Sequence, residues 1–257
     1  MPSLKATERH SQILAQLNSN GQTDVSALAE LLGVSSVTVR TDLLYLEKAQ
    51  MLRRIRGGAI AVRPSRYERP SDINASLHSA EKQAIATVAA SMIHDGETII
   101  LDTGSTVEAL ASSLPLQLMD IAVVTSSLNV AMELVNHPGS TVIVTGGTLR
   151  PKLHSLIQPL GNLLLAEINA DVAFMSCAGV DAAKGFTNSN WHEAEVKKAM
   201  IKAAAKVIFL ADHTKLKHVA TARIAACEEV DTLITDAKAS PDAVRELREQ
   251  GIEVIVA

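Results

Sequence analysis

The chain has 257 residues, a net charge of −4 and a 47% share of apolar residues, which fits a water-soluble protein of one or two domains. No apolar run approaches the roughly 18 residues of a membrane span, and the N-terminus lacks the apolar region of a signal peptide. Cys177 and Cys227 have neither metal-binding nor redox spacing. We therefore expect a cytoplasmic protein that contacts no membrane and needs no cofactor.

Charge is distributed unevenly along the chain. Residues 1–66 hold nine Lys and Arg against five Asp and Glu, a net charge of +4. The remaining residues hold 15 basic and 23 acidic side chains, a net charge of −8. A basic head on an acidic body is typical of a DNA-contacting module joined to a domain with a different task.

The first 62 residues follow the pattern of two helices, a tight turn and a basic hairpin. Apolar residues recur at helical spacing over 25–32 and over 36–46, and Gly33 stands between them, where a turn needs a positive φ. A strand over 52–56, a glycine pair and a returning strand over 59–62 follow. This order predicts a winged helix-turn-helix, which places one helix in the DNA major groove.

The second helix and the hairpin carry side chains suited to DNA. Ser and Thr reach base edges with hydroxyl and methyl groups, while Arg binds phosphate or guanine. The alternative is a helical hairpin whose basic face is merely solvated. The expected DNA contacts are Ser35, Ser36, Thr38, Arg40 and Thr41 on the helix, and Arg53, Arg54 and Arg56 on the hairpin.

This module resembles the N-terminal domain of the DeoR/GlpR family of bacterial transcriptional regulators. The family's helix reads VS-x-x-T-[IV]-R-x-DL and its hairpin reads R-x-x-GGA. This chain has VSSVTVRTDL from Val34 and RIRGGA from Arg54. Thr41 and Arg56 differ from the residues usual in the family. The resemblance implies sequence-specific binding of operator DNA, and a homodimer or homotetramer is expected because one helix-turn-helix rarely gives enough specificity.

A short segment with two prolines and four charges around Tyr67 separates this module from the rest of the chain. Such a composition indicates an exposed, semi-extended connector. We therefore predict a DNA-binding domain over 1–62, a connector over 63–79, and a sensor and oligomerisation domain over 80–257.

From Glu81 onward, short apolar strands alternate with helices. This alternation predicts an α/β domain whose mostly parallel sheet is covered on both faces. The expected strands are 98–101, 121–124, 141–144, 172–176, 207–210, 232–234 and 254–256.

Small, hydroxyl and charged residues follow four of these strands. Ligands of open α/β sheets bind beyond the carboxyl ends of the strands, and a helix that starts there offers free N–H groups to a phosphate. We therefore expect one shared pocket for a phosphorylated ligand. Its expected residues are Asp102, Thr103, Gly104, Ser105, Thr106, Thr125, Ser126, Gly146, Gly147, Arg150, Asp212 and Lys215.

This part resembles the sensor domain of the same family, which is similar to ribose-5-phosphate isomerase in the isomerase/CoA-transferase-like fold. The shared motifs are D-x-GST at 102–106, GG-x-x-R at 146–150 and D-[SH]-[ST]-K at 212–215. They imply a phosphorylated sugar as effector. In the same way, the resemblance adds Asn129, Asp181, Glu193 and Lys197 to the expected ligand-binding residues.

Ser126 and His213 depart from the family's more frequent Asn and Ser at these positions. We expect a repressor of a carbohydrate catabolic operon that a phosphorylated sugar releases from its operator. The alternative is a sugar-phosphate isomerase-like enzyme, in which Asp181, Glu193, Glu195 and Lys197 support proton transfer. The ordinary interpretation of these residues is a set of salt-bridged side chains on one helix face, with Glu193 and Lys197 four residues apart. No spacing predicts a metal site.

Overall fold

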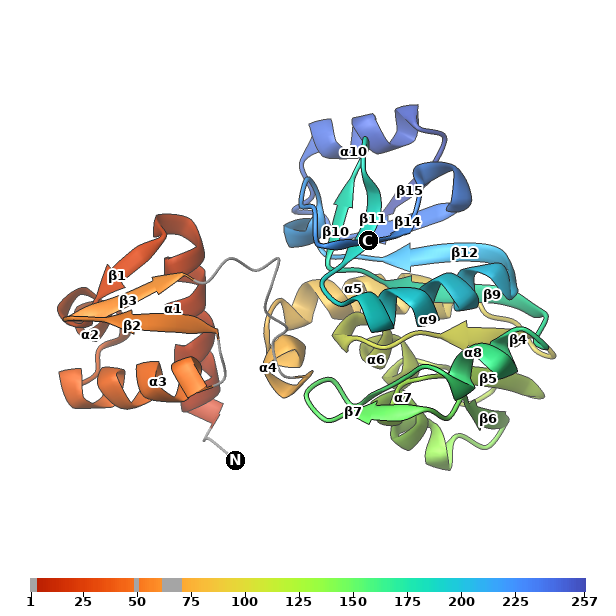
Figure 1. The fold of residues 1–257 in the computed structure, drawn as a ribbon, viewed down its shortest axis with the longest axis horizontal. Helices are drawn as coiled ribbons and strands as arrows, with labels where there is room; N and C mark the ends of the chain where they lie inside the picture. Colours follow the sequence, from red (N-terminus) through yellow and green to blue (C-terminus); the bar gives the residue numbers. More distant parts are fainter. Residues whose placement is uncertain (1–3, 49–50, 62–70) are drawn as a thin grey trace. The chain divides into compact units, whose positions relative to one another are not determined.

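The computed structural model describes residues 4–48, 51–61 and 71–257. The chain divides into two compact units, Met1–Leu77 and His78–Ala257, and each is described by itself (Figure 1). None of the helices in the described part of the chain is long and apolar enough to cross a lipid bilayer.

The helices of the N-terminal unit pack on an antiparallel sheet with the strand order β1–β3–β2 (Figure 1). Apolar residues from each helix, including Ile13, Leu28 and Leu43, meet in one core. This is the arrangement that the helical spacing predicts. The elements are α1 (Leu4–Asn20), β1 (Gln22–Asp24), α2 (Val25–Leu32), α3 (Ser36–Lys48), β2 (Leu52–Ile55), β3 (Gly58–Ala61) and α4 (Ser71–Ser76).

Two glycines allow the turn and the wing to form. Gly33 ends α2 with φ 62°, a left-handed conformation that costs glycine little. At Gly58, β3 crosses β1 so closely that a Cβ atom would lie 2.1 Å from the carbonyl oxygen of Thr23. The second glycine of the GGA motif is therefore required by packing.

Gly58→Ala is expected to destabilise the wing, because the new methyl group must push β3 away from β1. Overpacking of this kind costs about 1–3 kcal/mol. Hydrogen exchange over 52–61 in the full chain should therefore accelerate. The control is Gly57→Asn, since Gly57 has open space around it and Asn tolerates a positive φ. Equal exchange rates in the two variants would refute the packing argument.

The predicted connector over 63–79 is partly helical where the structure describes it. α4 contributes Ile73 to the N-terminal core, and α5 begins at Ser79. The proline-containing stretch around Tyr67 lies outside the described residues. The domain bounds 1–62, 63–79 and 80–257 stay a prediction, while the two compact units meet after Leu77.

The C-terminal unit is built on a seven-stranded sheet with the order β15–β14–β12–β9–β4–β5–β6. All neighbouring strands in this sheet run parallel. Each of the seven predicted strands is present, with small shifts at the ends. The strands are β4 (Thr98–Leu101), β5 (Ile121–Thr125), β6 (Ser140–Val144), β9 (Ala170–Ser176), β12 (Ala204–Leu210), β14 (Thr232–Thr235) and β15 (Glu253–Val256).

Helices cover both faces of this sheet, as predicted. One core contains Ile85, Val107 and Phe174, and a second contains Met200 and Phe209. Figure 1 shows α9 lying across the front of the sheet. The helices are α5 (Ser79–Ala90), α6 (Ser105–Ser112), α7 (Leu128–Glu133), α8 (Leu160–Leu165), α9 (Trp191–Lys202) and α10 (Pro241–Glu249).

Two small antiparallel sheets were not predicted, because strands of three or four residues are too short to show a period. β7 and β8 form a hairpin, and β10, β11 and β13 form a three-stranded sheet. Their bounds are β7 (Thr148–Arg150), β8 (Ser155–Ile157), β10 (Gly179–Asp181), β11 (Gly185–Asn188) and β13 (Ala222–Ala225).

Candidate functional site

The N-terminal end of α3 presents the predicted DNA-reading residues. Ser35 caps this helix, since its hydroxyl accepts a hydrogen bond of 3.1 Å from the Thr38 N–H. Ser36, Arg40 and Thr41 are exposed on the helix. The cap thus fixes where the helix begins, and three of the predicted side chains remain accessible to DNA.

The inner face of α3 is anchored to α1 by a buried carboxylate. Asp42 accepts hydrogen bonds from Arg9 Nε at 2.8 Å and Arg9 Nη2 at 3.0 Å. His10 Nε2 lies 3.0 Å from the same carboxylate, and its ring stacks on Tyr45. In the R-x-D motif, Arg40 therefore points outward and Asp42 points toward α1.

The three predicted arginines of the wing have different surroundings. Arg53 and Arg56 are exposed. Arg54 binds Glu47 on α3 through its Nε at 2.6 Å and through its backbone N–H at 2.9 Å. These side-chain and backbone hydrogen bonds hold the pKa of Glu47 below its usual value. Arg54 thus fastens β2 to α3, and Arg53 and Arg56 are the more accessible cations.

Sequence reasoning missed Val37. This side chain is 68% exposed in the first turn of α3, between Ser36 and Thr38. Exposed apolar groups at this end of a recognition helix can contact the thymine methyl group. The available signal was that Val37 falls out of phase with the buried Val39 and Leu43.

The strand order of the C-terminal sheet reverses between β4 and β9. The chain moves outward in one direction through β4, β5 and β6, and in the other through β9, β12, β14 and β15. Such a switch point opens a crevice at the carboxyl ends of the strands. Because neighbouring strands lie about 4.8 Å apart, the loops after β4, β9 and β12 form one row. Asp102, Ser176 and Asp212 belong to this row.

A buried ion pair occupies the switch point. Asp102 Oδ2 accepts hydrogen bonds from Lys197 Nζ on α9, from the Ser176 N–H at 2.9 Å and from Ser176 Oγ at 3.1 Å. The other carboxylate oxygen, Oδ1, and the Thr103 hydroxyl are buried without a hydrogen-bond partner in the described chain. Buried polar atoms are rarely left without a hydrogen-bond partner. These two atoms can therefore bind a hydroxyl-bearing ligand.

Gly104 lets the D-x-GST turn pass close to β9. Its φ is 135°, and a Cβ atom there would lie 2.8 Å from Ser176 Oγ. α6 then begins at Ser105, and Thr106 is buried in its first turn. The N–H groups of this first turn can bind an anion.

A second charged group follows β12. Asp212 caps a single 3-10 turn over His213–Lys215 and accepts hydrogen bonds from Thr214. Burial pushes the pKa of Asp212 up, but Lys215 and the Thr214 bonds outweigh it and hold that pKa below its ordinary value. Lys215 forms no ion pair with any described residue. Its ammonium group can therefore bind an anion.

The surroundings of Cys177 indicate that the Asp102–Lys197 ion pair and the Asp212–Lys215 group lie near each other. Burial raises the pKa of its thiol to about 12, and the charges that act on it are those of Lys215, Lys197, Asp212 and Asp102. The structure therefore brings together the residues after β4, those after β12, and Lys197.

Lys82, in the first turn of α5, is a buried cation near Asp212 that sequence reasoning missed. It is buried, and its charge acts on both Asp212 and His78. A lysine among the buried apolar positions of a helix was the available signal. Lys82 adds a further cation to the neighbourhood of Asp212.

Arg150 and Glu193 are joined to each other at the side of β7 and β8. Arg150 Nη1 donates to Glu193 Oε1 at 2.6 Å, and Ser155 Oγ donates to the same oxygen at 2.8 Å. Asn188 Nδ2 donates to the other oxygen at 3.1 Å. The interpretation of Glu193 and Lys197 as a salt-bridged pair on one face was wrong, because each side chain binds a different element.

The predicted residues after β5 mostly brace neighbouring loops. Asn129 Nδ2 donates to Glu108 Oε1 at 2.9 Å, and its Oδ1 lies 2.9 Å from His154 Nδ1. The Thr125 hydroxyl accepts a hydrogen bond from the Ser127 N–H at 3.0 Å, and Ser126 is buried.

Gly146 and Gly147, after β6, both have a positive φ. A Cβ atom on Gly147 would lie 2.1 Å from the carbonyl oxygen of Ile157. Gly147 is therefore required by the close passage of two chain segments, while Gly146 has room for a Cβ atom and is favoured only by its positive φ.

Asp181 has a local role. Its carboxylate accepts hydrogen bonds from the N–H groups of Ala183 at 3.0 Å and Lys184 at 2.9 Å, and so stabilises the turn between β10 and β11. No interaction within the described chain joins it to Asp102 or Lys215. Within the same residues, no group of three His, Cys, Asp or Glu side chains could hold a metal ion.

A winged helix-turn-helix and a separate α/β unit with polar and charged residues at its switch point define a two-part class of transcriptional regulator. Family models match both parts: a DeoR-like helix-turn-helix domain over residues 9–65 and a DeoR C-terminal sensor domain over residues 77–237. The chain belongs to the DeoR family of transcriptional regulators.

Similar proteins share almost the whole chain. The transcriptional regulator GolR of Listeria innocua is 36% identical over 252 residues, which cover 97% of this chain and 98% of GolR. The glycerol-3-phosphate regulon repressor of Escherichia coli is 28% identical, with coverage of 98% and 99%. This chain is accordingly a DNA-binding regulator and not an enzyme.

Another relative of nearly full length is a putative aga operon transcriptional repressor of E. coli O157:H7, which is 31% identical, with coverage of 97% and 93%. Among solved structures, a D-ribose-5-phosphate isomerase in complex with phospho-erythronic acid is similar, with a TM-score of 0.41 and 20% identity, over 53% of each chain.

Proposed function

We propose that this regulator is a cytoplasmic repressor of a carbohydrate catabolic operon, released from its operator by a phosphorylated sugar. The crevice supports this best, because it combines two kinds of group. Lys215 and the start of α6 suit a phosphate. The buried Asp102 Oδ1 can accept a hydrogen bond from a sugar hydroxyl.

Similar proteins support the same class of ligand. One relative is named for the glycerol-3-phosphate regulon, which refers to a phosphorylated polyol. The aga operon repressor is named as a repressor of an operon, as we propose for this chain. Repression followed by release also fits a protein that carries its DNA reader and its ligand crevice in separate units.

Operator recognition requires more than one copy of the chain. A single recognition helix reads only a few base pairs, and paired helices reading two half-sites give the needed specificity. We therefore propose a homodimer or homotetramer. The ligand would favour a state in which the paired helices no longer match the half-site spacing.

The test is a fluorescence anisotropy titration of labelled DNA from upstream of the gene, at fixed salt concentration. Sugar phosphates and their unphosphorylated parents are then added to the complex. Release by one phosphorylated sugar and not by its parent supports the proposal. Tight binding that no sugar phosphate affects would contradict the proposed effector class, and no binding to this DNA would contradict the proposed operator.

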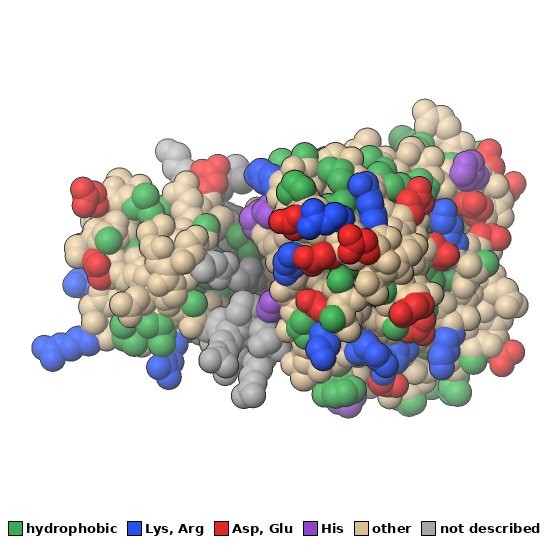
Figure 2. All heavy atoms as spheres, turned by 90° about the horizontal axis from the view of Figure 1, so that it is seen from above, with side chains coloured by type: hydrophobic (Ala, Val, Ile, Leu, Met, Phe, Trp, Pro, Cys, Tyr) green, Lys and Arg blue, Asp and Glu red, His purple; other side chains and the backbone are tan. Residues whose placement is uncertain are grey.

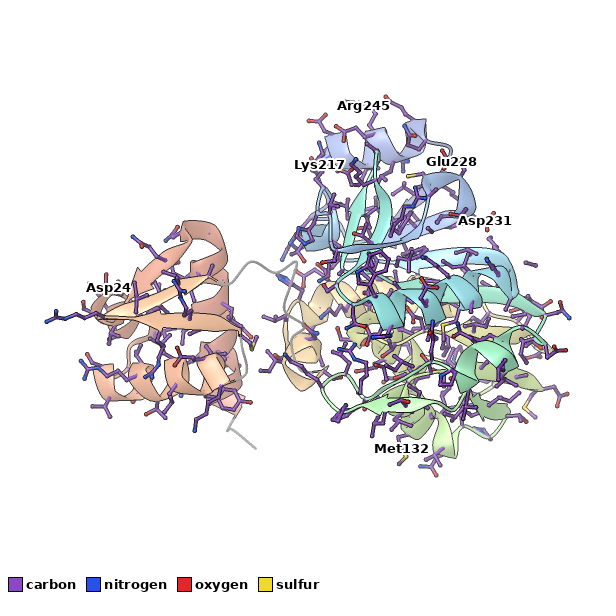
Figure 3. All side chains as sticks on the ribbon, in the orientation of Figure 1. Asp24, Met132, Lys217, Glu228, Asp231 and Arg245 are labelled. Atoms are coloured by element: carbon purple, nitrogen blue, oxygen red, sulfur yellow. The ribbon has the colours of Figure 1, made fainter. Side chains whose placement is uncertain are left out.

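Arg40→Ala is expected to weaken operator binding about 10- to 100-fold, because an Arg contact to a base or phosphate is worth about 1–3 kcal/mol. Anisotropy measures this loss, and calorimetric titration should show unchanged effector binding. Arg245→Ala is the control, since Figure 3 shows this exposed arginine on α10 of the other unit. Normal operator affinity in Arg40→Ala would remove Arg40 from the interface.

Acidic and basic side chains are interspersed on the face of the C-terminal unit that Figure 2 shows. A mixed surface of this kind attracts the DNA backbone weakly. The anisotropy signal in the control variant should therefore match that of the unmodified chain.

A further inference from the structure

A histidine lies at the point where the two units meet along the chain. The N-terminal unit ends at Leu77, which packs against that unit's core, and the C-terminal unit begins at His78. His78 precedes α5 with φ 54° and ψ 39°, the left-handed conformation. This backbone position is uncommon for residues other than glycine. The C-terminal unit therefore begins at a residue whose backbone conformation is unusual for its type.

The side chain of His78 contacts the loop of the ligand crevice. Its ring meets the ring of His213 edge to face, with a centroid distance of 5.2 Å and an interplanar angle of 83°. His213 is the first residue of the 3-10 turn that Asp212 caps and that ends at Lys215. The residue at the junction thus touches the segment that would bind a phosphate.

His213 is itself held firmly on its other side. Its backbone N–H donates to Asp236 Oδ2 at 2.7 Å, and its Nδ1 lies 3.0 Å from Oδ1 and 3.1 Å from Oδ2. Asp236 follows β14 and is buried. Asp236 therefore orients the ring of His213, and His78 contacts this ring, so a change in the turn would be felt at His78.

We propose that the contact between His78 and His213 couples the ligand crevice to the DNA-binding unit. The idea rests on the proposed function, since a ligand bound by Lys215 would be the natural trigger. Such a ligand would bind a turn of only three residues. A change in the position or mobility of Lys215 would therefore also change that of His213. His78 responds, and the next residue, Leu77, belongs to the core of the DNA-binding unit.

Coupling between two sites is reciprocal, so DNA can serve as the probe. Full-length protein is mixed with an operator duplex selected from a random DNA pool, and separately with a scrambled duplex. Hydrogen–deuterium exchange is then measured over 211–218. In the unmodified chain, we expect operator binding to change the exchange rate of this segment. The scrambled duplex should leave that rate unchanged.

The variant that tests the contact is His78→Gly, because glycine adopts the same φ without the ring. It should bind operator but lose the exchange change over 211–218. His213→Ala should lose the same change, and the double variant should lose no more than either single variant. His94→Ala is the control, since His94 is an exposed histidine of the same unit, paired with Glu97.

Each outcome of these exchange measurements either supports or overturns the proposed coupling. An exchange change that survives in His78→Gly would overturn the proposal, and so would an unmodified chain whose 211–218 segment ignores the operator. If no selected duplex binds, the regulator function and the coupling fail together. If the coupling is seen but no sugar phosphate releases the operator, only the proposed effector fails.

Discussion

Replacing Lys197 with Met is expected to lower the free energy of unfolding of the C-terminal unit by about 3–5 kcal/mol. The methionine fills a similar volume but leaves the carboxylate of Asp102, which is 1% exposed, without its cation. Ser176 alone cannot compensate for a buried charge. Breaking one side of a buried ion pair is far more costly than removing both sides.

Two further variants test whether the loss of stability comes from the unpaired charge of Asp102. Lys198→Met removes the neighbouring surface pair with Glu195 and should cost no more than about 1 kcal/mol. Asp102→Asn combined with Lys197→Met should recover much of the loss, since no buried charge remains. Guanidinium unfolding is followed by the fluorescence of Trp191, the only tryptophan, which lies at the start of α9. A Lys197→Met variant as stable as Lys198→Met would contradict the assigned role.

Lys215→Ala is expected to raise the effector concentration needed for operator release about 10- to 100-fold, with operator affinity unchanged. A charge-assisted hydrogen bond to a phosphate contributes about 1.5–3 kcal/mol, and Lys215, in the proposed pocket, forms no ion pair with any described residue. Lys197, by contrast, already neutralises Asp102. The loss should therefore appear in the response to ligand and not in DNA binding.

Lys217→Ala is the matched control for this variant. Lys217 lies two residues further on and pairs with Glu246 of α10 at 2.9 Å, toward the outer edge of the unit in Figure 3. Anisotropy titrations of operator complexes with the releasing sugar phosphate compare the two variants. An unchanged midpoint in Lys215→Ala would exclude Lys215 from the pocket.

The large elements could be predicted because their signal is local. Each strand of the parallel sheet is a run of aliphatic residues, and α2 and α3 show their buried faces as helical spacing. The cap at Ser35 and the glycine at Gly33 mark the turn between those helices. Short strands such as β10 and β11 carry no comparable signal, since their pairing is decided by neighbours distant in the sequence.

The sequence predicts a site at the strand ends but could not predict the contacts of its residues. The predicted residues lie at the strand ends, and the charges of Asp102, Lys197 and Asp212 all act on Cys177. Motif spacing could not show that Asp181 stabilises a hairpin turn, because that depends on which N–H groups the turn exposes. It also could not show that Glu193 binds Arg150, since that pair joins elements 43 residues apart.

The most direct test of the whole account is a calorimetric titration of the releasing sugar phosphate into the protein, with and without saturating operator. We predict that the sugar phosphate binds more weakly to the operator complex, by the same factor by which it weakens operator binding. We also predict that its unphosphorylated parent binds neither form. Equal affinity of the sugar phosphate for the free protein and for the operator complex would contradict the account.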